Sequence, residues 1–221
     1  ILREKIFKNI WIQPAAGDAG AALGAALFVW FKYLGNKRNA NGIKDSQKGS
    51  FLGTYYSNEE IKKVLDEYQI KYERVSDNEL IEKTAQLINQ KNVIGWFQDK
   101  MEFGPRALGA RSIIGDARSQ EMQSKMNLKI KFRESFRPFA PTVLKDKCSE
   151  YFDLDIESPY MLLVAPVKEN KRIEAINESI KGFEKLKTNR SVIPSVTHVD
   201  YSARIQTIKR EDNPLYYDLI K

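Results

Sequence analysis

Apolar and polar positions are spaced differently along this chain, and the spacing predicts its secondary structure. In the first part, residues 7–13 are predicted to form a strand, and residues 19–34 a helix that ends at Gly35. Asp18 stands where the N-cap of this helix is expected. Residues 36–50 are polar, aperiodic and rich in Asn, Lys and Gly, so they predict a linker and a domain boundary.

After this linker, predicted helices alternate with predicted strands. Ser57 with Glu60, and Ser76 with Glu79, form two capping-box patterns, and each pattern opens a helix. The apolar stripe of the first helix consists of Ile61, Val64, Leu65 and Tyr68. The residues of the second helix that are expected to face inward are Leu80, Ile81, Ala85, Leu87 and Ile88. Strands are expected at residues 71–75, 93–98, 139–144, 160–167 and 203–208, and further helices from Ser119 to about Asn127 and from Asn213 onward. This mixture predicts an α/β layer fold.

Length and composition limit the class of protein. With 221 residues and 42% hydrophobic content, the chain can bury the core of one domain and part of a second. No apolar run reaches the ~20 residues of a membrane-spanning helix, so we expect a soluble protein without a membrane partner. Cys148 is the only cysteine and His198 the only histidine, which predicts a reducing compartment, the cytoplasm, and excludes a zinc site built from this chain alone. Because the first residue is Ile1 and not Met, we expect a piece of a longer protein.

The formal net charge is +7, a moderate basic excess. Such an excess is compatible with an ordinary solvated surface that carries extra lysines. It is also compatible with an anionic partner such as phosphate, nucleotide or nucleic acid. The placement of the cations along the chain has to decide between these interpretations.

Residues 102–112 form the first segment with candidate chemistry. They follow a predicted strand, contain Gly104 and Gly109, and place Arg106 and Arg111 five residues apart. Glycines let a backbone approach a ligand closely, and arginine forks match the oxygens of phosphate or carboxylate groups. An ordinary Gly-Pro loop with two exposed arginines is the alternative, and the pattern alone leaves it open.

Residues 129–141 form the second segment. Lys129, Lys131 and Arg133 alternate with apolar residues, so an extended backbone would place all three cations on one face. Arg137 follows between aromatic and proline neighbours, which leave its guanidinium few rotamers to lose when it binds an anion. A basic edge strand that prevents aggregation, or a nucleic-acid-binding surface, would show the same pattern.

Residues 196–206 form the third segment. His198, Asp200, Arg204 and Gln206 have the same parity and would share one polar face of a strand. A single histidine is more often a hydrogen-bonded structural residue than a catalyst. We therefore interpret His198 as structural or substrate-orienting in preference to a proton-transfer group.

Together these segments resemble one family, the O-carbamoyltransferases of the nodulation-protein and antibiotic-biosynthesis type. The matching pieces are residues 13–27, 102–112, 131–141 and 198–206, in the family's order. The resemblance implies two catalytic units, an actin-like unit that transfers the carbamoyl group and a YrdC-like α/β domain that activates it.

The resemblance divides the chain into two domains and a linker. It implies that residues 1–35 are the last strand and helix of the actin-like unit, and that residues 36–50 are the linker. Residues 51–221 would then form most of a YrdC-like domain, a twisted mixed sheet with flanking helices. Because family members continue beyond Lys221, we expect the fragment to be truncated there and inactive alone.

The resemblance also implies a reaction and its site residues. The YrdC-like pocket takes carbamoyl phosphate and ATP, with Mg²⁺, and makes carbamoyl-adenylate; a hydroxyl of a sugar or secondary metabolite then accepts the carbamoyl group in the actin-like unit of the same polypeptide. The expected catalytic residues are Lys131, nearest the reacting phosphate, and Arg106. The expected substrate- and nucleotide-binding residues are Gly104, Arg106, Gly109, Arg111, Lys131, Arg137, His198, Asp200 and Arg204.

Asp18 has two interpretations. Its position favours an N-cap, whereas the resemblance matches it to an aspartate that holds a metal ion, with iron as the candidate, in the complete actin-like site. The histidines that complete that site in the family precede Ile1 and are absent here.

A function without catalysis is the alternative to the carbamoyltransferase hypothesis. A basic RNA-binding domain or a nucleotide-sensing domain would also explain the charge, and RNA binding would weaken steeply with added salt. The closely set, proline-framed arginines favour a compact pocket over a nucleic-acid groove.

Overall fold

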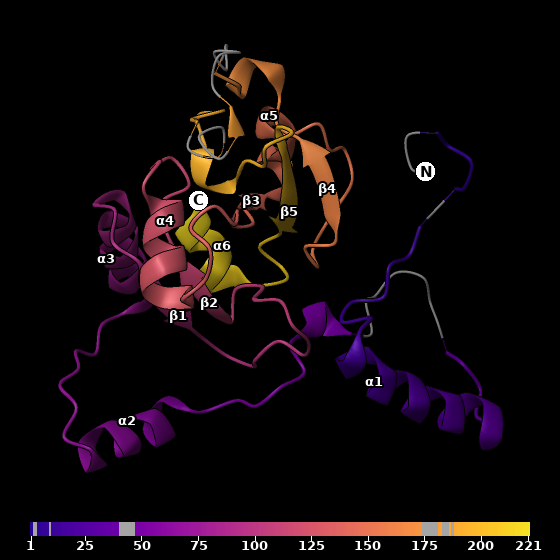
Figure 1. Cartoon of the computed structure of the whole chain (residues 1–221). Coiled ribbons are helices and arrows are strands. Elements are labelled where there is room, and N and C mark those ends of the chain that lie inside the picture. Colours follow the sequence, from indigo (N-terminus) through magenta and orange to yellow (C-terminus); the bar gives the residue numbers. More distant parts are fainter. Residues whose placement is uncertain (2–3, 9, 40–46, 174–180, 183–185, 187) are drawn as a thin grey trace.

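The computed structural model describes residues 1, 4–8, 10–39, 47–173, 181–182, 186 and 188–221 (Figure 1). Helices and short sheets combine in it into a mixed α/β architecture, which confirms the predicted α/β class, whereas the YrdC-like form of the sheet stays a prediction. Within the described part of the chain, no helix has the length and apolar character needed to cross a bilayer.

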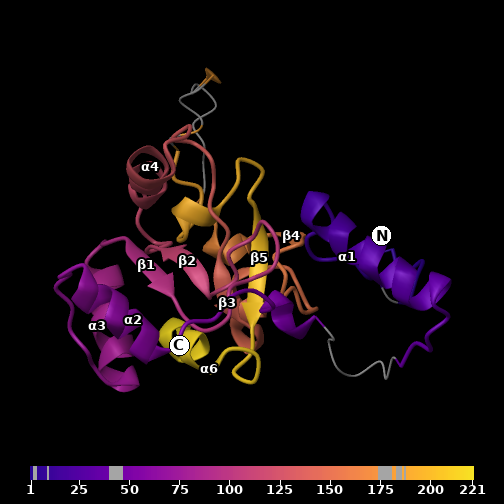
Figure 2. The same cartoon turned by 90° about the horizontal axis from the view of Figure 1, so that it is seen from below.

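The first helix lies apart from the sheets. Helix α1 (Asp18–Phe28) continues as a π-helical turn (Val29–Tyr33), and Gly35 ends it with a φ of 67°. Both views place α1 beyond β4, on the opposite side of the body from α3 (Figure 1, Figure 2). The predicted N-cap was wrong, because Gly17 occupies that position and Asp18 is the first helical residue. The strand predicted at residues 7–13 was also wrong, because the described residues there pair with no strand.

Both predicted capping boxes are confirmed. In α2 (Asn58–Glu67), Ser57 Oγ accepts a bond from Glu60 N, and the Glu60 carboxylate accepts one from Ser57 N. Ser76 and Glu79 repeat the arrangement at α3 (Asp77–Asn89). No residue of α2 is buried, and of its apolar stripe only Leu65 is half-buried, while the helix lies away from the sheets in Figure 1.

The helix α3 packs on the body through part of its predicted face. Leu80 and Ile88 contact the core that contains Trp96, whereas Ala85 and Leu87 are exposed, so the prediction was wrong for these two. The strand predicted at residues 71–75 does not form. Its segment runs from α2 to α3 without a neighbouring strand to pair with.

Two small sheets form the body. Strand β1 (Ile94–Phe97) pairs antiparallel with β2 (Arg111–Ile114). The second sheet has the order β3-β5-β4, in which β3 (Thr142–Leu144) is parallel and β4 (Leu163–Pro166) antiparallel to β5 (Ser202–Ile208). Strands β1, β3 and β4 lie within the predicted ranges, and β5 begins one residue before its range. Strand β2 was not predicted, and β1 buries only Trp96 and is not the fully buried strand that was expected.

The remaining helices are short. They are α4 (Met122–Met126), which continues as a π-helical turn (Asn127–Lys131), α5 (Cys148–Tyr151), α6 (Pro214–Ile220) and the 3-10 turns Lys48–Ser50, Lys145–Lys147, Glu169–Lys171 and Pro194–Val196. The helix expected from Asn213 onward forms as α6, and Asn213 caps it, with its side-chain oxygen accepting a bond from Tyr216 N. Ser119 does not cap α4, because the residue at the N-cap is Glu121.

Three apolar cores of the described residues hold these elements together, and the smallest contains Leu108, Tyr160 and Met161. Another contains Phe152, Val167 and Ile205, which are almost fully buried around β4 and β5. The third joins Trp96 of β1 to Tyr216 of α6. Burial raises the pKa of Tyr216 to about 12, so its hydroxyl stays protonated in this core.

Candidate functional site

The segment 102–112 is wound around one buried carboxylate. Glu102 is 3% exposed, and its Oε1 accepts hydrogen bonds from the backbone N–H groups of Leu108 at 2.6 Å, Ala110 at 2.8 Å and Arg111 at 3.3 Å. Bonds to an ionised acceptor are stronger than neutral ones. Glu102 therefore fixes the shape of the loop that carries Arg106. The sequence analysis missed this role, although an acidic residue beside a glycine-rich loop was a usable signal.

Arg111 completes the loop from its other side. Its guanidinium donates to the carbonyl oxygens of Glu102 at 3.0 Å and Gly104 at 2.8 Å, and its Nε lies 3.3 Å from Glu102 Oε2. These contacts hold the side chain against its own loop. The predicted role of Arg111 as a substrate ligand stays a prediction, and these donors would have to be shared.

The two glycines of this loop are needed for conformation and for packing. Gly104 and Gly109 have φ values of 116° and 111°, which side-chain-bearing residues rarely adopt. A Cβ at Gly104 would lie 2.6 Å from the Cβ of Ala15, and one at Gly109 would lie 2.3 Å from the Tyr216 ring. Both close contacts are to protein atoms.

Asp18 shares a cavity with this loop. The cavity has a volume of about 650 Å³ and is lined by Asp18, Gly17, Glu102, Gly104 and Arg111, among others. Among the described residues no group of three His, Cys, Asp or Glu side chains could hold a metal ion. Although Glu102 also lines the cavity, the described chain thus gives Asp18 no such group of three, and Asp18 does not make a metal site by itself.

The basic segment that follows α4 is organised by a buried asparagine. Asn127 is 0% exposed, and its Nδ2 donates to the carbonyl oxygens of Ser135 at 3.1 Å and Arg137 at 2.8 Å. Its Oδ1 accepts a bond from Arg133 Nε at 2.6 Å. The predicted extended face of Lys129, Lys131 and Arg133 was wrong, because residues up to Lys131 continue the helix and Phe132 reverses the chain with a φ of 48°.

The guanidinium groups of Arg106 and Arg133 both lie within electrostatic reach of Arg204 on β5. Burial lowers the pKa of Arg204, and the nearby charges of Arg106 and Arg133 lower it further. Among the described carboxylates none forms an ion pair with Arg106, Arg133 or Arg204, and Arg106 Nε is buried without a hydrogen-bond partner in the described structure. We call Arg106, Arg133 and Arg204 the arginine cluster. It is a concentration of positive charge without a neutralising partner, as an anion-binding site requires.

The other two predicted cations lie differently. Arg137 forms an exposed ion pair with Glu134 at 3.5 Å, and its charge helps to lower the pKa of Arg133 after the larger effect of burial. Lys131 is exposed at the end of the π-helical turn, and none of its described contacts joins it to the arginine cluster. The structure therefore brings Arg106 within electrostatic reach of Arg204 and Arg137 within electrostatic reach of Arg133, whereas no described contact joins Lys131 to these groups.

His198 and Asp200 lie in the turn before β5 and not on its face, because the strand begins only at Ser202. Asp200 Oδ1 accepts bonds from Ser202 N at 3.0 Å and Ser202 Oγ at 2.6 Å, and the latter bond uses the hydroxyl proton. His198 Nδ1, at 2.9 Å from Ser202 Oγ, is then the donor, which leaves Nε2 as an acceptor. Burial lowers the pKa of His198, with Asp200 opposing the shift and Arg204 adding to it.

Gln206 does not share a polar face with His198 and Asp200. It is 3% exposed, and its Nε2 donates to the Leu108 carbonyl at 2.8 Å while its Oε1 accepts a bond from Thr142 Oγ1 at 3.0 Å. Gln206 thus connects β3 and β5 to the loop that carries Arg106. Its role in the structure is to hold that loop on the sheet.

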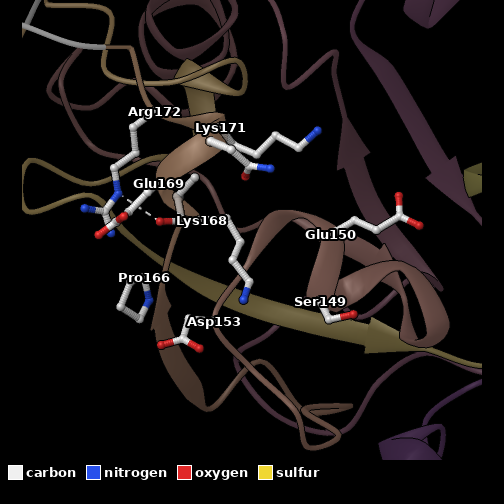
Figure 3. Close-up of a pocket in the computed structure, with 10 residues that line it drawn as sticks. Ser149, Glu150, Asp153, Pro166, Lys168, Glu169, Lys171 and Arg172 are labelled. Carbon is white, nitrogen blue, oxygen red and sulfur yellow. Dashed lines mark hydrogen bonds between the residues drawn. The ribbon is translucent and has the colours of Figure 1, made fainter.

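A separate cavity of about 770 Å³ contains none of the predicted site residues (Figure 3). Its charged lining residues are Lys168, Lys171, Arg172, Glu150, Asp153 and Glu169. Three cations and three carboxylates balance there, in contrast to the arginine cluster. This balance makes the arginine cluster the better candidate for binding polyanionic ligands.

Comparison with known proteins identifies the family of this chain. The family model for the carbamoyltransferase C-terminus matches residues 85–221, and the model for the carbamoyltransferase N-terminus matches residues 1–27. The chain is 56% identical over its whole length to an uncharacterized protein of Synechocystis, of which it covers 36%.

Two relatives with informative names extend the comparison. Nodulation protein NolNO of Sinorhizobium fredii is 38% identical over the whole chain, which covers 30% of that protein. The 3'-hydroxymethylcephem-O-carbamoyltransferase of Streptomyces clavuligerus is 28% identical over 97% of the chain, which covers 34% of that protein. The chain thus spans about a third of the length of the curated relatives it matches. By the match of residues 85–221 and by these relatives, this chain belongs to the carbamoyltransferase family.

Proposed function

We propose that the intact protein is an ATP-dependent O-carbamoyltransferase of the cytoplasm. In this proposal residues 51–221 belong to a YrdC-like domain that activates carbamoyl phosphate, and residues 1–35 belong to an actin-like domain that completes the transfer. Membership of the carbamoyltransferase family supports the reaction class. The name of the Streptomyces clavuligerus relative supports a hydroxyl acceptor, such as that of a sugar or a secondary metabolite.

The arginine cluster is the observation that carries the proposal. Carbamoyl phosphate and the triphosphate of ATP repel each other, so a site that holds both needs fixed positive charge. Burial and the charges of Arg106 and Arg133 together lower the pKa of Arg204, which means that each of these two cations repels Arg204. A bound polyphosphate relieves this repulsion, and this relief favours its binding.

The proposed activation has two steps. Water cleaves carbamoyl phosphate to carbamate and phosphate, and a carbamate oxygen then attacks the α-phosphorus of ATP. The bond from the α-phosphorus to its bridging oxygen breaks, so that carbamoyl-adenylate and pyrophosphate form. In the actin-like domain the acceptor hydroxyl attacks the carbamoyl carbon, loses its proton and releases AMP. Preorganised cations lower the barrier where charge moves onto the leaving oxygens.

Each cation has a role in this reaction. Arg106 and Arg137 act as clamps on phosphate oxygens, and Lys131 supplies a point charge near the reacting phosphate. Lys131 is exposed, so this role requires its flexible side chain to reach the bound ligand. Arg204 orients carbamoyl phosphate or the nucleotide. Its charge also acts on His198, whose pKa it lowers. Asp200 fixes His198 through Ser202.

The proposal assigns no catalytic step to a metal ion. Mg²⁺ accompanies ATP in this proposal, but the described residues show no carboxylate group that identifies its ligands, so no step is derived through it. Asp18 fits a metal site, with iron as the candidate metal, only if ligands from outside this chain join it. We therefore assign Asp18 no catalytic step.

Pyrophosphate release by the intact protein tests the proposal. With ATP and carbamoyl phosphate together, we expect pyrophosphate release and carbamoyl-adenylate in the mass spectrum, and neither product when carbamoyl phosphate is omitted. Arg106→Ala and Lys131→Ala should reduce the release. Pyrophosphate release that ignores carbamoyl phosphate would contradict the proposal, and RNA binding that weakens steeply with salt would favour the nucleic-acid alternative.

A further inference from the structure

Arg133 is the member of the arginine cluster that the sequence motifs did not assign to the site. Its guanidinium is fixed on two sides. The Nε donates to Asn127 Oδ1 at 2.6 Å, and the carbon of the guanidinium lies 4.8 Å from the centroid of the Phe139 ring. Because Asn127 is itself fully buried and bonded to two backbone carbonyls, the support under Arg133 is rigid.

The bond from Nε to Asn127 leaves the two terminal amino groups of Arg133 as its remaining side-chain donors. No acceptor in the described chain forms a hydrogen bond with them, and the exposed Glu134 acts on the pKa of Arg133 through its charge alone. The guanidinium lies close enough to Arg204 and Arg137 for its charge to interact with both. Arg133 is therefore held with its unused donors among other cations, where an anion has to be bound for the charges to be neutralised.

We propose that Arg133 is a phosphate-binding residue and that it holds the same phosphate group as Arg204. This inference rests on the proposed function and assigns a further ligand to its polyphosphate site. A guanidinium whose Nε is occupied and whose plane is stacked presents one edge with two donors, which matches two oxygens of a phosphate. Little side-chain entropy remains to be lost when it binds.

The chain contains a matched arginine for comparison. Arg172 also lies over an aromatic ring, with its guanidinium carbon 5.2 Å from the Tyr201 centroid, and its Nε donates to the Val167 carbonyl at 2.9 Å. Figure 3 shows Arg172 at the charge-balanced cavity, which lies outside the arginine cluster. Loss of Arg172 removes the same kind of packing without touching the proposed phosphate site.

Equilibrium binding of inorganic pyrophosphate and of ATP to the intact protein, by isothermal titration calorimetry, tests the inference without turnover. We expect Arg133→Ala to weaken both affinities about 10- to 100-fold, as for the loss of a charge-assisted bond. Arg133→Lys should fall between this variant and the wild type, and Arg172→Ala should bind as the wild type does. Equal affinities of Arg133→Ala and the wild type, or an equal loss in Arg172→Ala, would overturn the inference.

A double-mutant cycle tests the shared phosphate. If Arg133 and Arg204 hold one group, the variant that lacks both should bind pyrophosphate no more than about tenfold more weakly than the poorer single variant. Fully multiplicative losses would overturn the shared-phosphate assignment. Failure of the proposed function is a separate result, because an intact protein that binds pyrophosphate through Arg133 but releases none from ATP would contradict only the activation chemistry.

Discussion

Asn127 Oδ1 accepts a 2.6 Å hydrogen bond from Arg133 Nε, and this bond joins the end of a helical turn to the basic loop that follows it. The same asparagine holds two backbone carbonyls of that loop. One buried amide thus determines where two arginines of the candidate site, Arg133 and Arg137, can lie.

Replacement of Asn127 should destabilise the protein. Asn127→Ala leaves the carbonyls of Ser135 and Arg137 and the Nε of Arg133 without their partner, at a cost of about 2–4 kcal/mol in the free energy of unfolding. Urea denaturation measures this cost. Asn92→Ala, which removes one exposed bond to the Leu87 carbonyl, should cost less than about 1 kcal/mol. Similar values for the two variants would show that Asn127 does not organise the loop.

Replacement of Glu102 should loosen the loop that carries Arg106. Glu102→Ala removes the acceptor of three backbone N–H groups and the partner of Arg111, so we expect a loss of about 3 kcal/mol or more in the free energy of unfolding. Glu102→Gln should keep part of this stability, because an amide oxygen can still accept some of these bonds. Glu82→Ala, on the exposed side of α3, is the control and should change little. A Glu102→Ala variant as stable as the control would contradict the role of Glu102.

Gly109 should tolerate no side chain. Gly109→Ala combines a φ of 111° with a Cβ 2.3 Å from the buried Tyr216 ring, so it should cost about 2 kcal/mol or more. Gly95 in β1 is exposed, and a Cβ added there would meet no atom within 4 Å, so Gly95→Ala should be nearly neutral or stabilising. Thermal unfolding of both variants makes the comparison. A larger loss in Gly95→Ala would contradict it.

His198 should make the protein less stable as the pH falls from neutrality. Its pKa is lowered below the ordinary 6.5 by burial, so the unfolded chain takes up a proton at a higher pH than the folded one. The stability contribution is therefore complete above 6.5 and is lost as the pH falls toward the lower folded pKa. The carboxylates Asp200, Glu60 and Glu79 also have lowered pKa values, but their ordinary values of 3.8 and 4.5 place their losses at lower pH.

A histidine variant separates this effect from the rest of the chain. His198→Asn keeps a donor for Ser202 but cannot titrate, so it should lose less stability than the wild type between about pH 7.5 and about pH 5.5. Urea denaturation at both pH values provides the measurement. An identical loss in the two proteins would show that His198 does not contribute.

Much of the fold could be predicted from local patterns. The capping boxes at Ser57 and Ser76 depend on neighbours three residues away, and both form as expected. The helix expected from Asn213 onward also forms, as α6. The strands expected at residues 7–13 and 71–75 failed because a strand also needs a partner, and no local pattern reports one.

The candidate site was predictable only in part for the same reason. The motifs drew attention to Arg106 and Arg204, which the fold brings within electrostatic reach of each other. Arg133 was assigned to the wrong geometry, because alternation suggested an extended segment whereas the helix of α4 continues to Lys131. Asn127, six residues before Arg133, and Phe139, six residues after it, both contact the Arg133 side chain. These contacts depend on the reversal of the chain at Phe132.

Pyrophosphate release in the intact protein, compared between wild type and Arg204→Ala, tests most directly whether the arginine cluster activates carbamoyl phosphate. We expect release that requires both ATP and carbamoyl phosphate and that falls about 100-fold or more in Arg204→Ala, as for the loss of a cation that stabilises developing charge. Arg74→Ala, which removes an exposed arginine, should keep the wild-type rate. Equal rates in wild type and Arg204→Ala would contradict the account.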